Sequence, residues 1–206
     1  MLHPSTELRF INDRTGRGIV ATRPIPRGTI VWAADPLDQV ISFKRFRNLP
    51  RAMRRQVDTY AYLDEGGFVL CWDNAKYMNH SCEPACLGGG YNFELAVRDI
   101  APGEELTGDY GAMNPDVVFE CLCALPQCRH RILPDDLVTH STRWDAQVWD
   151  AFQLIRSVDQ PLWELVDPWE QKQVGKVLAG KKRMISCLEN YLGPQPKLER
   201  LYAELD

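Results

Sequence analysis

The chain has 206 residues, of which 45% are hydrophobic and 25% are charged. These fractions are typical of a soluble globular protein, and no apolar run is long enough to span a membrane. The formal net charge of −4 argues against binding to nucleic acid by bulk charge, although it suits a site that receives a basic peptide. Since no secretory leader is visible, we expect an intracellular protein.

Short strands are predicted in the first half of the chain. Residues 8–11 and 18–22 are apolar or β-branched and flank an Asn-, Asp- and Gly-containing turn, which predicts a hairpin. Residues 29–32 predict a third strand after a Pro- and Gly-containing turn. The apolar runs over 68–72 and 93–97 predict two more strands, so this half is expected to be mainly β.

A basic segment lies between Asp38 and Asp58. It contains no acidic residue and carries six basic ones, namely Lys44, Arg45, Arg47, Arg51, Arg54 and Arg55. Such a segment can contact a phosphate backbone, so residues 44–55 are a candidate contact with nucleosomal DNA. Composition alone favours the simpler interpretation of a solvated helix face beside Pro50.

After Pro134 the hydrophobic period becomes helical. Three groups of apolar residues recur at helical spacing: Trp144, Val148, Phe152 and Ile155; then Val174, Val177, Leu178, Ile185, Leu188 and Leu192; then Leu198, Leu201, Tyr202 and Leu205. Proline and glycine residues separate the groups. We therefore predict a helical appendage over residues 134–206, with Trp144 and Phe152 as packing residues.

The spacing of the cysteines indicates a metal site. Cys121, Cys123 and Cys128 place three thiols close together, and a reducing compartment favours metal binding over disulfides. Structural zinc takes four ligands in a tetrahedron, so the fourth must come from elsewhere in the chain. Cys86 and His130 are two candidates.

Four motifs together resemble one known family. They are Gly16-Arg17-Gly18, Asn79-His80-Ser81-Cys82, Glu105-Leu106-Thr107-Gly108-Asp109-Tyr110 and the cysteine group above. In this order they resemble a SET-domain protein lysine methyltransferase with a post-SET zinc-binding segment. The resemblance implies an α+β fold, with a β-rich SET domain of short strands and a pseudoknot over residues 1–120, a post-SET segment over 121–133, and the helical appendage behind it.

The resemblance also implies an activity and a set of site residues. The activity is methyl transfer from S-adenosylmethionine to a lysine of a protein, a histone or another basic protein by analogy. Gly16, Arg17, Gly18, Asn79 and His80 would bind the cofactor, Tyr110 would be catalytic, Tyr60, Tyr62 and Gly108 would line the substrate channel, and Cys82, Cys121, Cys123 and Cys128 would bind zinc. The implied compartment is the nucleus in a eukaryote, and the cytoplasm or a host cell for a bacterial protein.

Two departures from the family pattern matter. Ala85 stands where the family usually has Asn, and Gly108 stands where it usually has Tyr or Phe. Because glycine removes a ring from the expected channel, we expect the product to reach di- or trimethyl-lysine unless another side chain fills the space. The alternative function is a catalytically weak SET module that binds chromatin or a protein partner.

Overall fold

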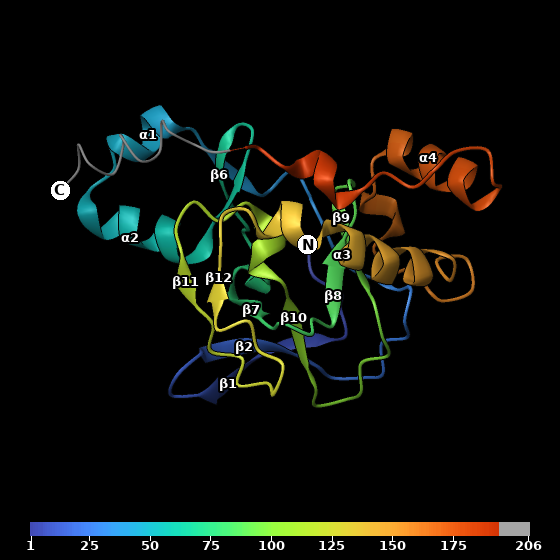
Figure 1. Ribbon diagram of the computed structural model, residues 1–206, viewed down its shortest axis with the longest axis horizontal. Helices are drawn as coiled ribbons and strands as arrows, with labels where there is room; N and C mark the ends of the chain where they lie inside the picture. Colours follow the sequence, from blue (N-terminus) through green and yellow to red (C-terminus); the bar gives the residue numbers. More distant parts are fainter. Residues whose placement is uncertain (194–206) are drawn as a thin grey trace.

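Figure 1 shows the computed structural model of the protein, which describes residues 1–193. The predicted N-terminal hairpin is confirmed as β1 (Thr6–Asn12) and β2 (Gly16–Ala21). These strands continue into a sheet of order β1-β2-β10-β7. Here β10 (Glu105–Gly108) is antiparallel to β2 and parallel to β7 (Asn79–His80). A late segment of the chain thus lies between two earlier ones.

A second sheet has the order β3-β9-β8 and consists of β3 (Ile30–Ala33), β9 (Phe93–Ala96) and β8 (Cys86–Gly88). Side chains alternate between the two faces of a strand. Phe93 and Leu95 therefore share one face of the sheet, and both belong to the largest hydrophobic cluster. Glu94 points to the opposite face.

The helix α3 (Asp136–Phe152) packs on this sheet, and α4 (Pro168–Leu178) contributes Val174 and Val177 to the same hydrophobic cluster (Figure 1). Trp144 and Phe152 are fully buried in the cluster that contains Phe93, as the helical spacing predicts for packing residues. The hydrophobic core therefore extends across residue 134. The domain boundary placed there stays a prediction.

The helix expected to continue from Val174 to Leu192 ends at Leu178. Gly180 adopts a left-handed conformation with φ of 68°. Its N–H donates to the carbonyl of Val177 at 2.9 Å. The N–H of Lys181 donates to the carbonyl of Lys176, also at 2.9 Å. This arrangement closes the helix with a glycine, which the periodicity of apolar residues does not reveal. The helix expected over Leu198–Leu205 lies outside the described residues.

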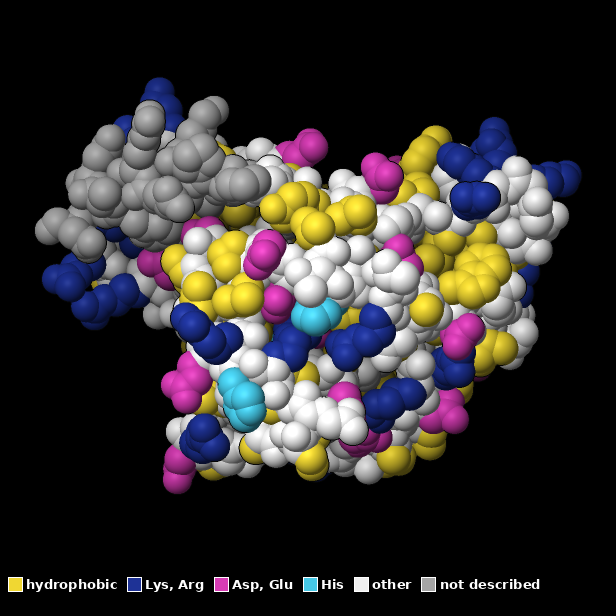
Figure 2. All heavy atoms as spheres, viewed as in Figure 1, with side chains coloured by type: hydrophobic (Ala, Val, Ile, Leu, Met, Phe, Trp, Pro, Cys, Tyr) yellow, Lys and Arg dark blue, Asp and Glu magenta, His cyan; other side chains and the backbone are white. Residues whose placement is uncertain are grey.

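A third sheet consists of β4 (Gln39–Ile41), β6 (Gly67–Leu70) and β5 (Tyr62–Asp64). The basic segment forms α1 (Phe43–Arg47) and α2 (Arg51–Tyr60), with Pro50 between them. These helices lie at the opposite end of the molecule from α4 (Figure 1). Lys and Arg side chains gather at that end of the surface (Figure 2).

The remaining elements are short. The strands β11 (Phe119–Glu120) and β12 (Arg131–Ile132) pair with each other and bracket the cysteine-rich loop. Single 3₁₀ turns are η1 (Asn74–Tyr77), η2 (Tyr110–Met113), η3 (Trp163–Leu165) and η4 (Cys187–Asn190). Within residues 1–193, no helix has the length and apolar character that crossing a membrane requires.

Candidate functional site

The sheet β1-β2-β10-β7 brings three of the motifs together. Thr107 pairs with Asn79, and Gly108 pairs with His80, across the parallel ladder between β10 and β7. On its other side β10 pairs with β2, which contains Gly18. Segments that are far apart in the sequence therefore form one continuous surface.

The side chain of Asn79, on β7, is hydrogen-bonded to both of the other strands of this surface, β2 and β10. Its Nδ2 donates to the Arg17 carbonyl at 3.0 Å and to Oε1 of Glu105 at 2.7 Å. A Cβ at Gly18 would lie 2.1 Å from Glu105 Oε1 and 2.8 Å from Asn79 Nδ2. The missing side chain at Gly18 thus gives room to these two residues, whereas the sequence suggested room for a cofactor. Glu105 is a further residue of the site that its motif contained but whose role we did not predict.

His80 is nearly buried, with a side-chain exposure of 6%. Its Nδ1 accepts a hydrogen bond from the backbone N–H of Tyr110 at 3.2 Å, and its Nε2 lies 3.5 Å from Sγ of Cys82. Burial lowers the pKa of His80 to about 4, so the ring is neutral at pH 7. The family resemblance assigned a role to the backbone of His80. The structure shows that its ring also connects the start of η2 to the cysteine cluster.

Tyr110 begins η2 and is separated from the end of β10 by Asp109. Its hydroxyl donates to the Met78 carbonyl at 3.0 Å. Burial, followed by the charge of Glu105, raises the pKa of Tyr110 to about 12, so the phenol stays protonated at pH 7. Asp109 caps the turn by accepting from the N–H of Gly111 at 3.0 Å. Tyr110 is therefore fixed through its hydroxyl, which is bonded to Met78, and through its backbone N–H, which is bonded to His80.

A cavity of about 290 Å³ lies next to Tyr110, and Tyr60 and Tyr62 also line it. The structure thus brings the predicted catalytic tyrosine and the two predicted channel tyrosines to one cavity. Gly108 does not line it. A Cβ at Gly108 would lie 3.2 Å from Cε of Met113 and 3.5 Å from Sδ of Met78. These two flexible side chains therefore fill the space where a ring was expected.

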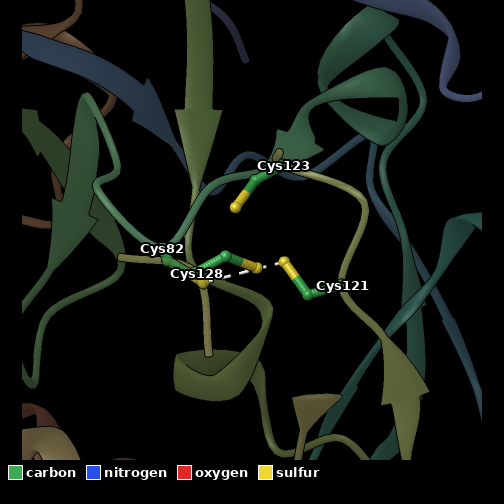
Figure 3. A group of neighbouring side chains, drawn as sticks. All are labelled: Cys82, Cys121, Cys123 and Cys128. Atoms are coloured by element: carbon green, nitrogen blue, oxygen red, sulfur yellow. Dashed lines mark hydrogen bonds between the residues drawn. The ribbon is translucent and has the colours of Figure 1, made fainter. Parts of the chain in front are cut away.

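The four cysteines assigned to zinc lie together (Figure 3). Their sulfur atoms all lie within 4.8 Å of one another, and those of Cys82 and Cys121 are 3.6 Å apart. Tetrahedral zinc with Zn–S distances near 2.3 Å places its sulfur atoms about 3.8 Å apart, so the donor set fits the ion. The alternative ligands Cys86 and His130 are not members of this group.

The backbone around the cysteines supplies N–H groups to the sulfur atoms. The N–H of Arg129 donates to Cys82 Sγ at 3.4 Å, and the N–H of His130 donates to Cys128 Sγ at 3.2 Å. His130 adopts a left-handed conformation with φ of 64°, which turns its N–H back toward the cluster. Although burial opposes ionisation, backbone hydrogen bonds lower the pKa of Cys123 to about 7. These donors favour thiolates, the form that binds metal.

Comparison with known proteins agrees with this arrangement. Residues 16–111 match the family described as SET domain. Residues 16–111 are thus similar to a SET domain. The matched SET range begins at Gly16 and ends just after Tyr110, so it contains the three motifs that meet at the sheet β1-β2-β10-β7. It excludes three cysteines of the cluster, Cys121, Cys123 and Cys128.

Curated relatives of the SET domain have related names. The chain is 31% identical over 127 residues to "Histone-lysine N-methyltransferase trithorax" of Drosophila virilis, covering 55% of this chain and 3% of that protein. It is 44% identical over 62 residues to "Histone-lysine N-methyltransferase TRX1" of Oryza sativa subsp. japonica, covering 27% of this chain and 6% of that protein. The chain therefore spans only a small part of these relatives.

A solved structure, "crystal structure of KRYPTONITE in complex with mCHG DNA and SAH", covers 59% of this chain and 28% of its own. Its sequence identity to this chain is 22%, and the TM-score is 0.41.

Proposed function

We propose that the protein is an S-adenosylmethionine-dependent protein lysine N-methyltransferase. The observation that carries the proposal is the position of Tyr110. Its ring lines the cavity, while its backbone N–H is bonded to His80, next to Asn79 on the same strand. One residue thus connects a cavity suited to a side chain with the surface that the family uses for the cofactor. The names of the curated relatives support the same activity.

Methyl transfer to an amine depends mainly on alignment and on a neutral nucleophile. S-adenosylmethionine would supply an electrophilic methyl group carried by a positively charged sulfur. A free lysine has a pKa near 10.4, so very little of it is neutral at pH 7, and transfer into an apolar channel lowers that value. Tyr60, Tyr62 and Tyr110 offer such walls beside the cavity.

The residues divide into three roles. Asn79 and His80 would hold the cofactor together with residues 16–18. The hydroxyl of Tyr110, fixed by Met78, would orient the amine and stabilise the reacting groups electrostatically. Zinc bound by Cys82 and the three later cysteines would fix the loop that follows η2.

The substrate we propose is a histone or another basic protein, and the compartment is the nucleus if the source is a eukaryote. The exposed arginines of α2 support a contact with nucleosomal DNA beside the substrate. The alternative, a SET module that binds chromatin without catalysis, is disfavoured by the ordered contacts of Tyr110 and His80.

A methylation assay with labelled S-adenosylmethionine and purified histones tests the proposal. We expect label on histone lysines. Tyr110→Phe should lower kcat by about a hundredfold or more while the calorimetric Kd for the cofactor changes little, and Asn79→Ala should mainly raise that Kd. Tyr191→Phe, outside the cavity, is the matched control. Absence of transfer by the wild type to histones and to total cell protein would contradict the proposal, as would full activity of Tyr110→Phe.

A further inference from the structure

The cavity beside Tyr110 has a strongly acidic lining. Its acidic side chains are those of Asp58, Asp64, Glu94, Asp109 and Asp116, and its single basic side chain is that of Lys76. The ammonium group of Lys76 already donates to the carbonyls of Trp72 at 3.2 Å and Asp73 at 2.9 Å. Asp109 is neutralised by Arg129. The carboxylates of Asp64, Glu94 and Asp116 outnumber the single ammonium of Lys76, so a ligand of this cavity should be cationic.

Glu94 is the carboxylate for which the protein itself provides least compensation. It lies on β9 and pairs with Trp32 of β3 on one side and with Gly88 of β8 on the other. Since Gly88 has no side chain, the space beside the Glu94 carboxylate belongs to the cavity, which all three residues line.

Three buried polar atoms of cavity residues have no hydrogen-bond partner among the described residues. They are Oε2 of Glu94, Oδ2 of Asp116 and Nε1 of Trp32. A buried polar group without a partner destabilises the folded protein. Burial raises the pKa of Glu94 to about 7, because no positive group compensates its charge. A ligand that brings N–H donors and positive charge would satisfy the two carboxylate oxygens, of Glu94 and Asp116.

Aromatic rings complete the surroundings of Glu94. The rings of Trp32 and Tyr62 meet edge to face with centroids 6.2 Å apart, and both line the cavity. A cation that approaches Glu94 therefore also passes aromatic surface, which attracts ammonium and guanidinium groups. The combination of a buried carboxylate and aromatic walls selects for a basic side chain.

We propose that Glu94, Trp32 and Tyr62 form a binding site for a second basic side chain of the substrate protein, next to the lysine that is methylated. This inference rests on the proposed function. The target lysine of the proposed function lies at Tyr110 in the same cavity, whereas this site lies where Glu94 of β9 pairs with Trp32 of β3. The charge of Glu94 helps to raise the pKa values of Tyr62, Cys71 and Cys86. It does not contribute to the raised pKa of Tyr110, which agrees with a position of Glu94 apart from Tyr110.

The test uses small probes and needs no cofactor. The full chain labelled with ¹⁵N at its tryptophans is titrated with n-butylammonium, with n-butylguanidinium and with the neutral 1-butanol, while the Trp32 indole N–H signal is followed by NMR. Trp32→Phe assigns that signal. We expect at least one of the two cations to shift it and to bind about tenfold more tightly than 1-butanol. In Glu94→Gln the preference for the cation should disappear.

Two further variants make the outcome decisive. Glu164→Gln removes an equal charge from an exposed position outside the cavity and should leave the preference intact. Asp116→Asn should weaken the preference if Glu94→Gln proves too unstable to measure. Equal binding of the cations and 1-butanol, or a preference that survives both cavity substitutions, would overturn the proposal. Since no methyl transfer is measured, a protein that binds the cations but lacks transferase activity would contradict only the proposed function.

Discussion

The guanidinium of Arg129 holds both carboxylate oxygens of Asp109, each at 2.7 Å. It also lies 3.2 Å from Asp136 at the start of α3. Arg129 directly follows Cys128, and Asp109 directly precedes Tyr110. One side chain therefore connects the cysteine loop, the turn η2 and the helix α3.

This contact predicts a large effect on stability. In Arg129→Met the carboxylate of Asp109 would stay buried without its partner, since its side chain is 0% exposed. Losing one member of a buried pair costs about 3–5 kcal/mol, so the free energy of unfolding in urea should fall by about that much. Arg98→Met is the matched control. Arg98 pairs with Glu104 at the surface, and the change should cost less than about 1 kcal/mol. Equal losses for both variants would contradict the prediction.

The cysteine cluster predicts one zinc ion per molecule. Protein purified without chelator should contain close to one equivalent, and Cys82→Ser should contain less than half, because one of four ligands is lost. Metal analysis by mass spectrometry measures both.

The control for this prediction is Cys71→Ser. Cys71 is buried in a different part of the molecule and does not belong to the cluster, so this variant should keep its zinc. Unchanged zinc content in Cys82→Ser would remove Cys82 from the ligand set.

The sequence predicted which segments form the site, but it did not predict how their side chains interact. The order of motifs was sufficient to group Asn79, His80, Tyr110 and the cysteines, because each motif is short and specific. Glu94 and Arg129 were missed. Their roles depend on cross-strand register and on a loop conformation, with left-handed residues such as His130, that no local pattern encodes.

The appendage shows the same limit. Its helix α3 was predictable because Trp144, Val148 and Phe152 repeat at helical spacing. The end of α4 at Leu178 was not, since the apolar residues beyond Gly180 continue the spacing by coincidence. They pack through extended chain and η4 instead, with Cys187 in the shared core.

The environment of Glu94 predicts a pH-dependent stability. Its pKa is about 7 in the folded protein and 4.5 in the unfolded chain. Glu94 therefore binds more protons in the folded state between these values, so its contribution to the free energy of unfolding should fall as pH rises from about 4.5 to 7, by on the order of 3 kcal/mol. His80, whose pKa burial lowers to about 4, contributes in the opposite direction over much of this range, so the contribution of Glu94 is measured as a difference between the wild type and a variant. The neighbouring Tyr62, Cys71 and Cys86 have raised pKa values and titrate above this window.

Urea denaturation of Glu94→Gln across this pH range checks the prediction. The free energy of unfolding of the wild type minus that of Glu94→Gln should decline across this range, whereas the same difference for Glu164→Gln should stay constant. Identical pH profiles for the wild type and Glu94→Gln would show that Glu94 does not hold a proton in the folded state.

The exposed arginines of α2 predict salt-dependent activity on nucleosomes. Arg51 and Arg55 are exposed, whereas Arg54 donates to the carbonyls of Arg47 and Leu49 at 3.3 Å and supports the turn before α2. The double change Arg51→Gln and Arg55→Gln should therefore reduce the preference for nucleosomes over free histones without unfolding the helix. Each lost phosphate contact should lower the salt slope of nucleosome binding by about one.

The matched control for this surface is Arg14→Gln combined with Arg23→Gln. It removes the same charge from two exposed positions outside α2, one in the turn between β1 and β2 and one just after β2. This variant should keep the preference. If the wild type methylates nucleosomes and free histones equally well at low salt, α2 has no role in DNA contact.

Met113 predicts how many methyl groups the product carries. Its Cε would lie 3.2 Å from a Cβ at Gly108, so it takes the space that a tyrosine or phenylalanine ring would occupy in the family pattern. A missing ring at Gly108 thus does not by itself leave an open channel, because buried space is usually filled. Met113→Ala should open it and shift the product toward more highly methylated lysine, measured by mass spectrometry under excess cofactor. Met53→Ala, at an exposed position on α2, should leave the product unchanged.

The companion change, Gly108→Tyr, distinguishes the two residues. The ring can enter only if Met113 and Met78 move, and their flexible side chains allow this at some cost in stability. We expect Gly108→Tyr to shift the product toward monomethyl-lysine, and we expect Met113→Ala combined with it to restore activity lost through crowding. The same product distribution in the wild type, Met113→Ala and Gly108→Tyr would mean that this part of the wall does not contact the methylated amine.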